Sequence, residues 1–541
     1  MKLRIPDKKN HNQAGIIHEN ASIEHWNPGR RCTNSTIYSP NGAELFSADA
    51  FRSESIFLTD GSATIYYKDL PAVVQAAHDL FESRIRSQNA GHSPAAVETG
   101  YIAGIETTNR FQSILWMTYC WANAIPFVPF SKSNFGPVEL FRPDILITTS
   151  DESWSIPVNS ETADSDQEIS KLAPFINKPL ALFCGLTTSG SSGRPKRVAL
   201  LRKNMIAATR NSFRSVLPEK ESIEHLWGHC LPLDHAGGLS MVFRALHSGT
   251  GIYLWNKFDA SSILHSLNKH SAIKRISLVP TMLKRLLDHQ QDSGITPLHA
   301  LHQVLVGGGP ANPELIRGAR RSGWPVTFSY GMTETCGHIA CQNVDGSSPD
   351  GSVGRPFPDH AIEIRDDSGK TVKPGFSGTL FIKGPQLFPG YLPELTSISD
   401  FANDHFDTTE DGWFDTGDYA RMDLEGNLYI EARRTNLIVT GGKNVNPEEI
   451  ESILKRCEYI IDAAVTWLPD EEWGQLVVAM VIPVTMDINV KQRIHTYVSK
   501  SLKAHQRPKK IGFADVLPRT SLGKLERKNL QNLAKDRFSQ K

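Results

Sequence analysis

The amino-acid sequence predicts an α/β protein: a large N-terminal domain of parallel-sheet subdomains plus a β-rich subdomain, followed by a small, mobile α+β C-terminal domain. From about residue 179 to residue 330, short apolar strands alternate with helical stretches. After Gly351, the strands GTLFIKG and GNLYIEA lie between Gly, Pro and Asp turns, and a compact mixed unit follows residue 436. Alternating strands and helices are typical of a parallel sheet covered on both faces, and strands joined by short turns are typical of antiparallel sheets.

These changes in pattern divide the chain into an N-terminal extension (1–45), a large domain (46–435) and a small domain (436–541). The extension is polar and shows no clear period, so we expect it to be peripheral. In the large domain, the spacing of apolar residues predicts a helix over 68–85. The acidic, Ser-rich stretch 150–167 is expected to be a surface loop between subdomains.

Further helices are expected near 202–216 and 238–248 in the large domain. The small domain should begin its first helix after Asn446, an N-cap residue followed by Pro447 at the first helical position. Glu449 stands where a capping box would place it. Strands are expected around 463–467 and 476–484, and a helix should follow them.

The composition excludes several classes of protein. The 541 residues include 58 Lys and Arg against 58 Asp and Glu, so the net charge is zero and a general basic field for nucleic acid is absent. The longest apolar run, nine residues at 476–484, is much shorter than the roughly 18 residues of a membrane span. The first residues, MKLRIPDKKNHNQ, lack the apolar core of a signal peptide, and the seven cysteines are scattered. We expect a cytoplasmic protein with reduced thiols, no nucleic-acid partner and no membrane span.

The segment TTSGSSGRPK at 187–196 has the composition of a phosphate-binding loop, because glycines admit a polyphosphate to the backbone and hydroxyls donate to it. A plain Ser/Gly-rich surface loop is the alternative, but the order of these residues is a more specific signal than their composition. The pattern is not the Walker motif, since Pro precedes the lysine and no Ser or Thr follows it. The residues expected to contact phosphate are Thr188, Ser189, Gly190, Ser191, Ser192, Gly193 and Lys196.

The same segment resembles the signature of the adenylate-forming superfamily, which includes acyl-CoA synthetases, nonribosomal-peptide adenylation domains and luciferases. Arg197 replaces the usual final glycine. The resemblance extends from about residue 55 to 530, with six motifs in the family's order. Each motif alone could be an ordinary turn or strand end, but their order is poorly explained by chance. The resemblance implies ATP, Mg²⁺ and coenzyme A as cofactors.

YGMTE at 330–334 resembles the family motif in which Tyr330 stacks on adenine, Thr333 meets the α-phosphate and Glu334 holds Mg²⁺, and Gly331 is counted among the nucleotide-binding residues. Other motifs imply adenine contacts from Gly308, Gly309 and Pro310, and ribose contacts from Asp418 and Arg434.

By the same resemblance, the residues after Arg434 contain a hinge at Asn436 and a loop at 441–442 that faces pantetheine. Lys524, in PRTSLGK, corresponds to the catalytic lysine.

The implied reaction joins a carboxylate to the α-phosphate of ATP, releases pyrophosphate and then transfers the acyl group to a thiol. Two anions about 4 Å apart repel by roughly 4 kcal/mol at an effective dielectric near 20. Lys524 between the anions, Mg²⁺ on Glu334 and Lys196 on the leaving phosphates would each reduce that repulsion. Rotation of the small domain about residue 436 would withdraw Lys524 before the thiol attacks.

The carboxylic acid is indicated by two segments, HCLPLDHAGGL at 229–239 and ISLVPTMLKRLL at 276–287, which resemble o-succinylbenzoate–CoA ligases of menaquinone biosynthesis. The resemblance implies that Arg244, nine residues after His235, contacts the carboxylate that does not react. A guanidinium is the strongest side-chain partner for such a group. The alternative is a surface arginine that is paired elsewhere. The resemblance also places His235 at the acyl tunnel, and we expect Ser277 and Thr281 to contact the substrate.

The sequence therefore favours an ATP-dependent acid–CoA ligase acting on o-succinylbenzoate. Another aryl- or acyl-CoA synthetase, or an adenylating enzyme that loads a carrier protein, is the alternative within the same class. A nucleotide-binding pseudoenzyme is the alternative from another class. The expected partners are a small carboxylic acid, ATP and CoA, and we allow for a homodimer.

Overall fold

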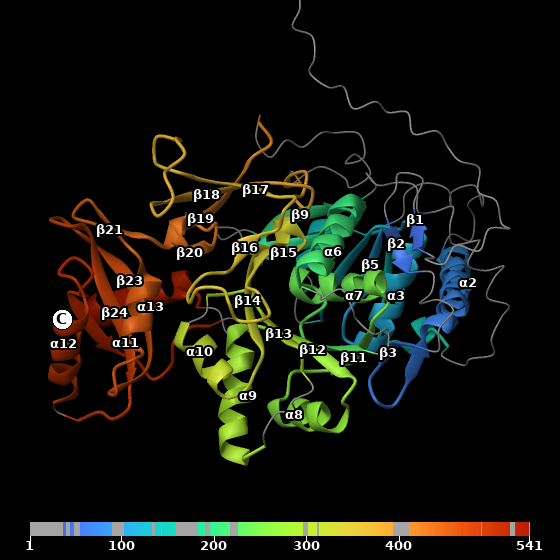
Figure 1. Ribbon diagram of the computed structural model, residues 1–541, viewed down its shortest axis with the longest axis horizontal. Helices are drawn as coiled ribbons and strands as arrows, with labels where there is room; N and C mark the ends of the chain where they lie inside the picture. Colours follow the sequence, from blue (N-terminus) through green and yellow to red (C-terminus); the bar gives the residue numbers. More distant parts are fainter. Residues whose placement is uncertain are drawn as a thin grey trace, which may run out of the picture.

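The computed structural model describes most of the chain. The described residues are 36–38, 44–47, 55–88, 102–132, 136–141, 143–157, 182–189, 195–216, 225–295, 301–310, 313–392, 411–487, 489–519 and 525–539. Figure 1 shows the parallel-rich sheets and their helices (blue to green) at one end and the C-terminal sheet with its helices (orange to red) at the other. The predicted fold class is confirmed; the boundary at residue 436 stays a proposal.

The largest sheet has nine strands, parallel in its centre and antiparallel at both edges. Its strands in spatial order are β16 (Arg355–Pro356), β15 (Gly337–Cys341), β14 (Val326–Met332), β13 (Gln303–Val306), β12 (Ile273–Leu278), β10 (Leu226–His229), β11 (Gly251–Leu254), β3 (Ile56–Thr59) and β4 (Thr64–Tyr66). The helices after its strands are α7 (Ala236–Ser248), α8 (Ala260–Lys269), α9 (Pro280–Ser293) and α10 (Pro313–Arg321). Because parallel strands end at the same edge, the loops after β10, β12, β13 and β14 lie together at that edge.

A second, five-stranded sheet carries the predicted phosphate segment. Its order is β7 (Ile145–Ile147), β5 (Ala103–Glu106), β6 (Phe127–Phe130), β8 (Leu182–Ser189) and β9 (Pro195–Leu201). The helices of this region are α2 (Leu70–Gln88), α3 (Arg110–Ala122), α4 (Gly136–Phe141) and α6 (Arg202–Val216). Strands β5 to β8 are parallel, and β8 and β9 form an antiparallel hairpin.

The two sheets share one hydrophobic core. Helix α3 is buried along its whole length, and α6 packs against α7. The ring centres of Trp121 and Phe183 lie 5.0 Å apart, and those of Phe183 and Phe243 lie 4.8 Å apart, so aromatic contacts link α3, β8 and α7. This core fixes the phosphate segment relative to the carboxyl edge of the large sheet.

The predicted β-rich region is an antiparallel sheet next to the C-terminal domain (Figure 1). Its strands are β17 (Ala361–Arg365), β18 (Ser377–Lys383), β19 (Phe414–Met422) and β20 (Leu428–Arg433). Short 3-10 helices lie at Tyr67–Asp69, Glu152–Trp154, Thr333–Thr335 and Arg434–Asn436.

The C-terminal domain is a five-stranded sheet covered by helices. Its strands are β22 (Lys443–Val445), β21 (Ile438–Thr440), β24 (Gly474–Pro483), β23 (Ile460–Asp470) and β25 (Lys510–Phe513), and its helices are α11 (Pro447–Leu454), α12 (Val490–Ser501) and α13 (Arg527–Ser539). Asn446 caps α11 by accepting a hydrogen bond from the backbone of Glu448. Glu449 does not complete the expected capping box, because its carboxylate accepts a hydrogen bond from Gln506 at 2.9 Å.

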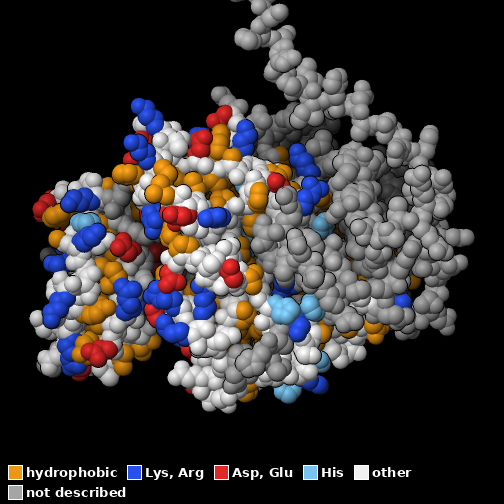
Figure 2. Space-filling model, in the orientation of Figure 1, with side chains coloured by type: hydrophobic (Ala, Val, Ile, Leu, Met, Phe, Trp, Pro, Cys, Tyr) orange, Lys and Arg blue, Asp and Glu red, His pale blue; other side chains and the backbone are white. Residues whose placement is uncertain are grey.

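Most of the expected extension lies outside the described residues. Near its end, β1 (Thr36–Tyr38) pairs with β2 (Glu44–Ser47), which lies against α7. Helix α6 coincides with the helix expected at 202–216, and α7 begins two residues before the one expected at 238–248. Among the described helices, none is long and apolar enough to cross a membrane. Figure 2 shows Lys, Arg, Asp and Glu side chains interspersed over the visible face, in keeping with the balanced charge of the sequence.

Candidate active site

The β8–β9 hairpin brings the two ends of the predicted phosphate loop together. Thr188 lies opposite Lys196 in the antiparallel register, and Ser189 lies opposite Pro195. The tip of the loop, including Gly190, Ser191, Ser192 and Gly193, lies outside the described residues, as does Lys524. The hairpin therefore places a hydroxyl residue and a cation on adjacent strands at the base of the loop.

Glu334 is buried and lies in the 3-10 turn 333–335, which directly follows β14. Tyr391 donates a hydrogen bond from its hydroxyl to Oε1 of Glu334 at 2.6 Å. The ammonium of Lys196 lies 4.3 Å from the centre of the Tyr391 ring, at cation–π distance. Burial and the neighbouring Glu334 raise the pKa of Tyr391, so its hydroxyl keeps its proton at neutral pH. The structure thus brings predicted phosphate and metal residues together through Tyr391, which the sequence analysis did not identify.

Asp418 lies in a second cluster at the end of the large domain. It accepts a hydrogen bond from the hydroxyl of Tyr330 at 2.5 Å and pairs with Arg433 at 3.1 Å. Arg433 also donates to the backbone oxygen of Thr416. Burial raises the pKa of Asp418 although Arg433 lowers it, and Glu334 adds to the rise.

Arg433, and not its neighbour Arg434, makes the contact to Asp418, and the expected ribose contact of Arg434 stays a prediction. Arg433 is the last residue of β20, whereas Arg434 begins the following 3-10 turn. The two side chains therefore leave the chain in different directions, and Arg434 pairs with Asp415 at 2.9 Å. The motif contains both arginines in sequence, and only the end of the strand decides between them.

Gly331 shows why the YGMTE segment requires a glycine. A Cβ atom at this position would lie 2.0 Å from the backbone oxygen of Gly337 on the adjacent strand β15. Gly308, Gly309 and Pro310 lie in the loop after β13, so they are at the same carboxyl edge of the sheet. Thr333 begins the turn that contains Glu334.

Arg244 projects from α7 into the interior, with 6% of its surface exposed. Its Nη2 donates to Oγ of Ser240 at 2.6 Å, and its guanidinium lies 5.5 Å from the centre of the Trp227 ring. Its Nη1 is buried and has no hydrogen-bond partner in the described part of the chain. Burial lowers the pKa of Arg244 to about 10, so the group remains charged at neutral pH. The alternative of a surface arginine is therefore wrong.

The other residues expected to contact the acyl substrate differ in their burial. Ser277 is buried on β12, where its hydroxyl accepts a hydrogen bond from the indole of Trp227 at 3.2 Å. His235 is exposed at the N-terminus of α7, and Thr281 is exposed in the first turn of α9. The structure thus brings Ser277 and Arg244 together around Trp227 and places His235 and Thr281 at the ends of the loops.

The loop that carries His235 is held by Arg110 and His229, to which the sequence analysis gave no role. Arg110 donates to Nδ1 of His229 and to the oxygen of Leu231, both at 2.7 Å. Since the oxygen of Gly238 can only accept, Nε2 of His229, 3.0 Å away, carries the proton. Burial and Arg110 hold the pKa of His229 well below its usual range, so the ring is neutral. The neutral ring can accept from Arg110 and donate to Gly238, which fixes the loop before α7.

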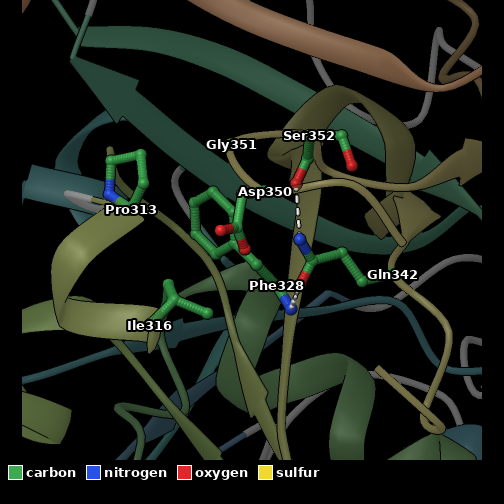
Figure 3. A pocket seen from close by; sticks show the side chains of 7 residues that line it. All are labelled: Pro313, Ile316, Phe328, Gln342, Asp350, Gly351 and Ser352. Atoms are coloured by element: carbon green, nitrogen blue, oxygen red, sulfur yellow. Dashed lines mark hydrogen bonds between the residues drawn. The ribbon is translucent and has the colours of Figure 1, made fainter. Parts of the chain in front are cut away.

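A separate hollow lies between α10 and the strands β14 and β15 (Figure 3). Gln342 crosses it, accepting from the backbone of Phe328 at 3.0 Å and donating to the oxygen of Ser352 at 2.8 Å. The Asp350 carboxylate at its rim pairs with Arg317 at 3.1 Å. None of the predicted site residues lines this hollow.

Comparison with known proteins agrees with these features. Two family models match, AMP-binding enzyme over residues 139–392 and AMP-binding enzyme C-terminal domain over residues 449–524. A 2–succinylbenzoate–CoA ligase of Enterococcus faecalis is 34% identical over 65% of this chain and 69% of its own length. The corresponding ligase of Bacillus subtilis is 30% identical over 88% of this chain and 96% of its own length.

The solved structures include o-succinylbenzoate CoA synthetase of Bacillus subtilis in complex with its acyl-adenylate intermediate. It superimposes with a TM-score of 0.72 at 28% identity, covering 88% of this chain and 95% of that chain. A double mutant of that enzyme bound to a product analogue has the same coverage of this chain but a TM-score of 0.58. The overall arrangement of this chain is thus more similar to that of the acyl-adenylate complex than to that of the product-analogue complex. The agreement of both family models with these relatives shows that the chain belongs to the AMP-binding enzyme family.

Proposed function

We propose that this chain is an ATP-dependent acid–CoA ligase that activates the succinyl carboxylate of 2-succinylbenzoate and transfers the acyl group to CoA. The observation that carries the choice of acid is the buried, positively charged Arg244. The relatives named 2-succinylbenzoate–CoA ligase support the same choice.

Arg244 needs an anionic partner that the described residues do not supply. No carboxylate among them forms an ion pair with it, and Nη1 remains without a hydrogen bond. An unpaired buried charge costs several kcal/mol, roughly 3–5 when a partner is removed from a buried pair. The second carboxylate of a dicarboxylic acid would remove that cost, and the Trp227 ring beside Arg244 would face the aromatic ring of the acid. A monocarboxylic fatty acid has no group for this position.

The residues around the nucleotide fit ATP and Mg²⁺. Oε1 of Glu334 accepts from Tyr391, which leaves Oε2 as a hard anionic ligand for a cation. The described residues contain no group of three or more metal-ligating side chains, in keeping with a Mg²⁺ ion held by one carboxylate and the phosphates of its substrate. When bound, Mg²⁺ would neutralise charge on the phosphates.

The chain's own residues would carry the other steps. Asp418 would accept hydrogen bonds from the ribose hydroxyls. Lys196 and the loop at 188–193 would hold the leaving phosphates. Lys524 would lie between the carboxylate and the α-phosphate and reduce their repulsion, so that catalysis is mainly positioning and charge stabilisation. The small domain would then turn about residue 436 and admit the thiol of CoA.

The test of the acid is a pyrophosphate-release assay with 2-succinylbenzoate and with 4-phenylbutanoate, each with and without CoA. Arg244→Ala should lower kcat/KM for the dicarboxylate by tenfold for each 1.4 kcal/mol lost, about 100-fold or more in total, and should change the monocarboxylate little. The matched control is Arg275→Ala, because the Arg275 guanidinium is also buried and lies 5.7 Å from the same Trp227 ring. That variant should affect both acids equally.

Other outcomes would select an alternative. A wild-type preference for the monocarboxylate would indicate another acyl-CoA synthetase, and transfer to a carrier protein instead of CoA would indicate a loading enzyme. Release of no pyrophosphate with any acid would favour a nucleotide-binding pseudoenzyme.

We also propose that the protein acts in the cytoplasm, and we allow for a homodimer. Reduced cysteines support the first inference, since the described cysteines are all free and buried. Sedimentation at micromolar concentration would test the second, and fractionation of cells would test the first.

A further inference from the structure

Tyr391 contacts two residues of opposite charge in the proposed nucleotide site. Its hydroxyl donates to Oε1 of Glu334 at 2.6 Å, and its ring face lies 4.3 Å from the ammonium of Lys196. The three side chains come from distant parts of the sequence: Lys196 from β9, Glu334 from the turn after β14, and Tyr391 from the segment after β18. One aromatic side chain therefore links the proposed metal ligand to the proposed phosphate cation.

The segment that carries Tyr391, residues 385–392, is fixed by its backbone. The amide of Asn204 on α6 donates to the oxygens of Pro385 and Leu387 at 3.0 and 2.8 Å. The backbone of Phe388 donates to the oxygen of Glu334 at 2.8 Å. The backbone of Leu392 donates to the oxygen of Arg197 at 3.0 Å.

Two further contacts hold Tyr391 itself. Tyr391 forms a β-bridge with Val198, and its ring packs against Phe388 with ring centres 4.9 Å apart. The position of the Tyr391 ring is thus set by α6, β9 and the turn after β14 before any ligand binds.

This arrangement has a consequence for both charged groups. With Oε1 of Glu334 occupied by the Tyr391 hydroxyl, the carboxylate is held in one orientation and presents its other oxygen. The ring face holds the Lys196 ammonium without neutralising it, because a cation–π contact supplies no negative charge. If the ring were absent, the ammonium and the carboxylate could form an ion pair with each other and neither would face the ligand.

We propose that Tyr391 is a positioning residue for Mg²⁺–ATP: its hydroxyl orients Glu334 toward the metal and its ring holds Lys196 toward the phosphates. The inference rests on the proposed function only for the identity of the nucleotide, and it makes no use of the carboxylic acid. The two contacts are separable, since Tyr391→Phe removes the hydroxyl and keeps the ring, whereas Tyr391→Leu removes both.

The test measures binding apart from turnover. The rise in melting temperature caused by ATP is recorded for each variant in Mg²⁺ and in EDTA, and Mg²⁺ is titrated at fixed ATP. Tyr391→Phe should raise the half-saturating Mg²⁺ concentration about 10–100-fold, as for the loss of other groups that orient a metal ligand. It should leave the effect of ATP in EDTA unchanged. Tyr391→Leu should reduce the effect of ATP in both solutions.

Two comparisons separate positioning from a loss of packing. Phe388→Leu removes the aromatic neighbour of Tyr391, so it should lower the melting temperature of the free protein while the Mg²⁺ titration stays unchanged. In a Glu334→Gln background, Tyr391→Phe should add nothing further to the Mg²⁺ response, because the residue acts through Glu334.

A wild-type Mg²⁺ response of Tyr391→Phe, or an additive loss in the Glu334→Gln background, would overturn the proposal. Since both titrations omit the acid and CoA, an error in the acyl substrate would leave them unaffected. A wild-type protein that shows no ATP effect would instead count against the proposed function.

Discussion

The proposed nucleotide side and the proposed acyl side of the site hold their charges differently. On the nucleotide side, Asp418 has Arg433 and Tyr330 as partners, and Glu334 has Tyr391. On the acyl side, Arg244 contacts a hydroxyl and an indole but no anion among the described residues. A metal ligand or a ribose acceptor needs lone pairs to spare, and a carboxylate retains them after one hydrogen bond. A buried cation that recognises one anionic group has no counter-ion within the protein. The site then discriminates against ligands that lack the anion, because such ligands leave the buried charge unpaired.

The largest expected effect comes from Lys524→Ala, because Lys524 is proposed to act where the two sides meet. Adenylate formation should fall by roughly 10²–10³-fold, the usual effect of removing one charge-stabilising donor. Thioester formation from a supplied acyl-adenylate should be spared, since the lysine has then left the site. Both half-reactions are to be measured separately. Equal losses in the two would contradict the domain rotation.

The fold could be read from the sequence because its signals are local and repeated. Apolar spacing predicted the helix observed as α2, and the strands expected around 463–467 and 476–484 are observed as β23 and β24. These elements depend on burial of one face, which the order of residues records directly. The failure of Glu449 as a capping residue depends instead on Gln506, which is 57 residues away.

The candidate site could be read only in part, for the same reason. Motifs brought Glu334, Asp418 and Arg244 to attention, but the sequence has no pattern that joins Tyr391 to Glu334 or Arg110 to His229. Those pairs meet only because α3, β10 and the segment at 385–392 pack into one core. Which of two adjacent arginines reaches Asp418 was equally invisible, since it depends on the residue at which β20 ends.

Glu334→Gln is expected to have the next largest effect, and it tests the nucleotide side alone. The amide oxygen can still accept from Tyr391, so folding should change little, but a hard anionic ligand is lost. The half-saturating Mg²⁺ concentration for ATP–pyrophosphate exchange should rise at least roughly tenfold. The dependence on the acid should be unchanged. Full activity at ordinary Mg²⁺ concentrations would show that Glu334 is not the metal ligand.

A smaller effect should distinguish the two adjacent arginines. Arg433→Ala removes the partner of a carboxylate that is 9% exposed, so KM for ATP should rise several-fold and stability should fall by about 1–3 kcal/mol. Arg434→Ala removes an ion pair whose side chains are 50% and 34% exposed, so its loss should cost less than about 1 kcal/mol. Chemical unfolding and ATP titration of both variants give the comparison. A larger effect at Arg434 would support the predicted contact of Arg434 with the ribose.

The smallest effect is expected from Asp418→Asn, and its sign is opposite for stability and for binding. Because burial raises the pKa of Asp418 above its unfolded value, the folded state binds the proton more tightly than the unfolded state. Stability therefore falls as pH rises from the unfolded pKa through the raised folded pKa, and the full cost is present at neutral pH. Asparagine carries no charge to bury, so the variant should melt about 1–3 °C higher than the wild type at pH 7.

The difference in melting temperature between Asp418→Asn and the wild type should shrink as pH is lowered into the carboxyl range, where Asp418 itself becomes protonated. Binding of ATP should weaken at the same time, because an amide accepts fewer hydrogen bonds from ribose than a carboxylate does. Melting curves at several pH values, with and without ATP, measure both effects on one sample. A variant that melts lower than the wild type at every pH would mean that the Arg433 pair more than offsets the cost of burying Asp418. The nucleotide side would then be stabilised by its charges, and its contrast with Arg244 would be greater than the structure implies.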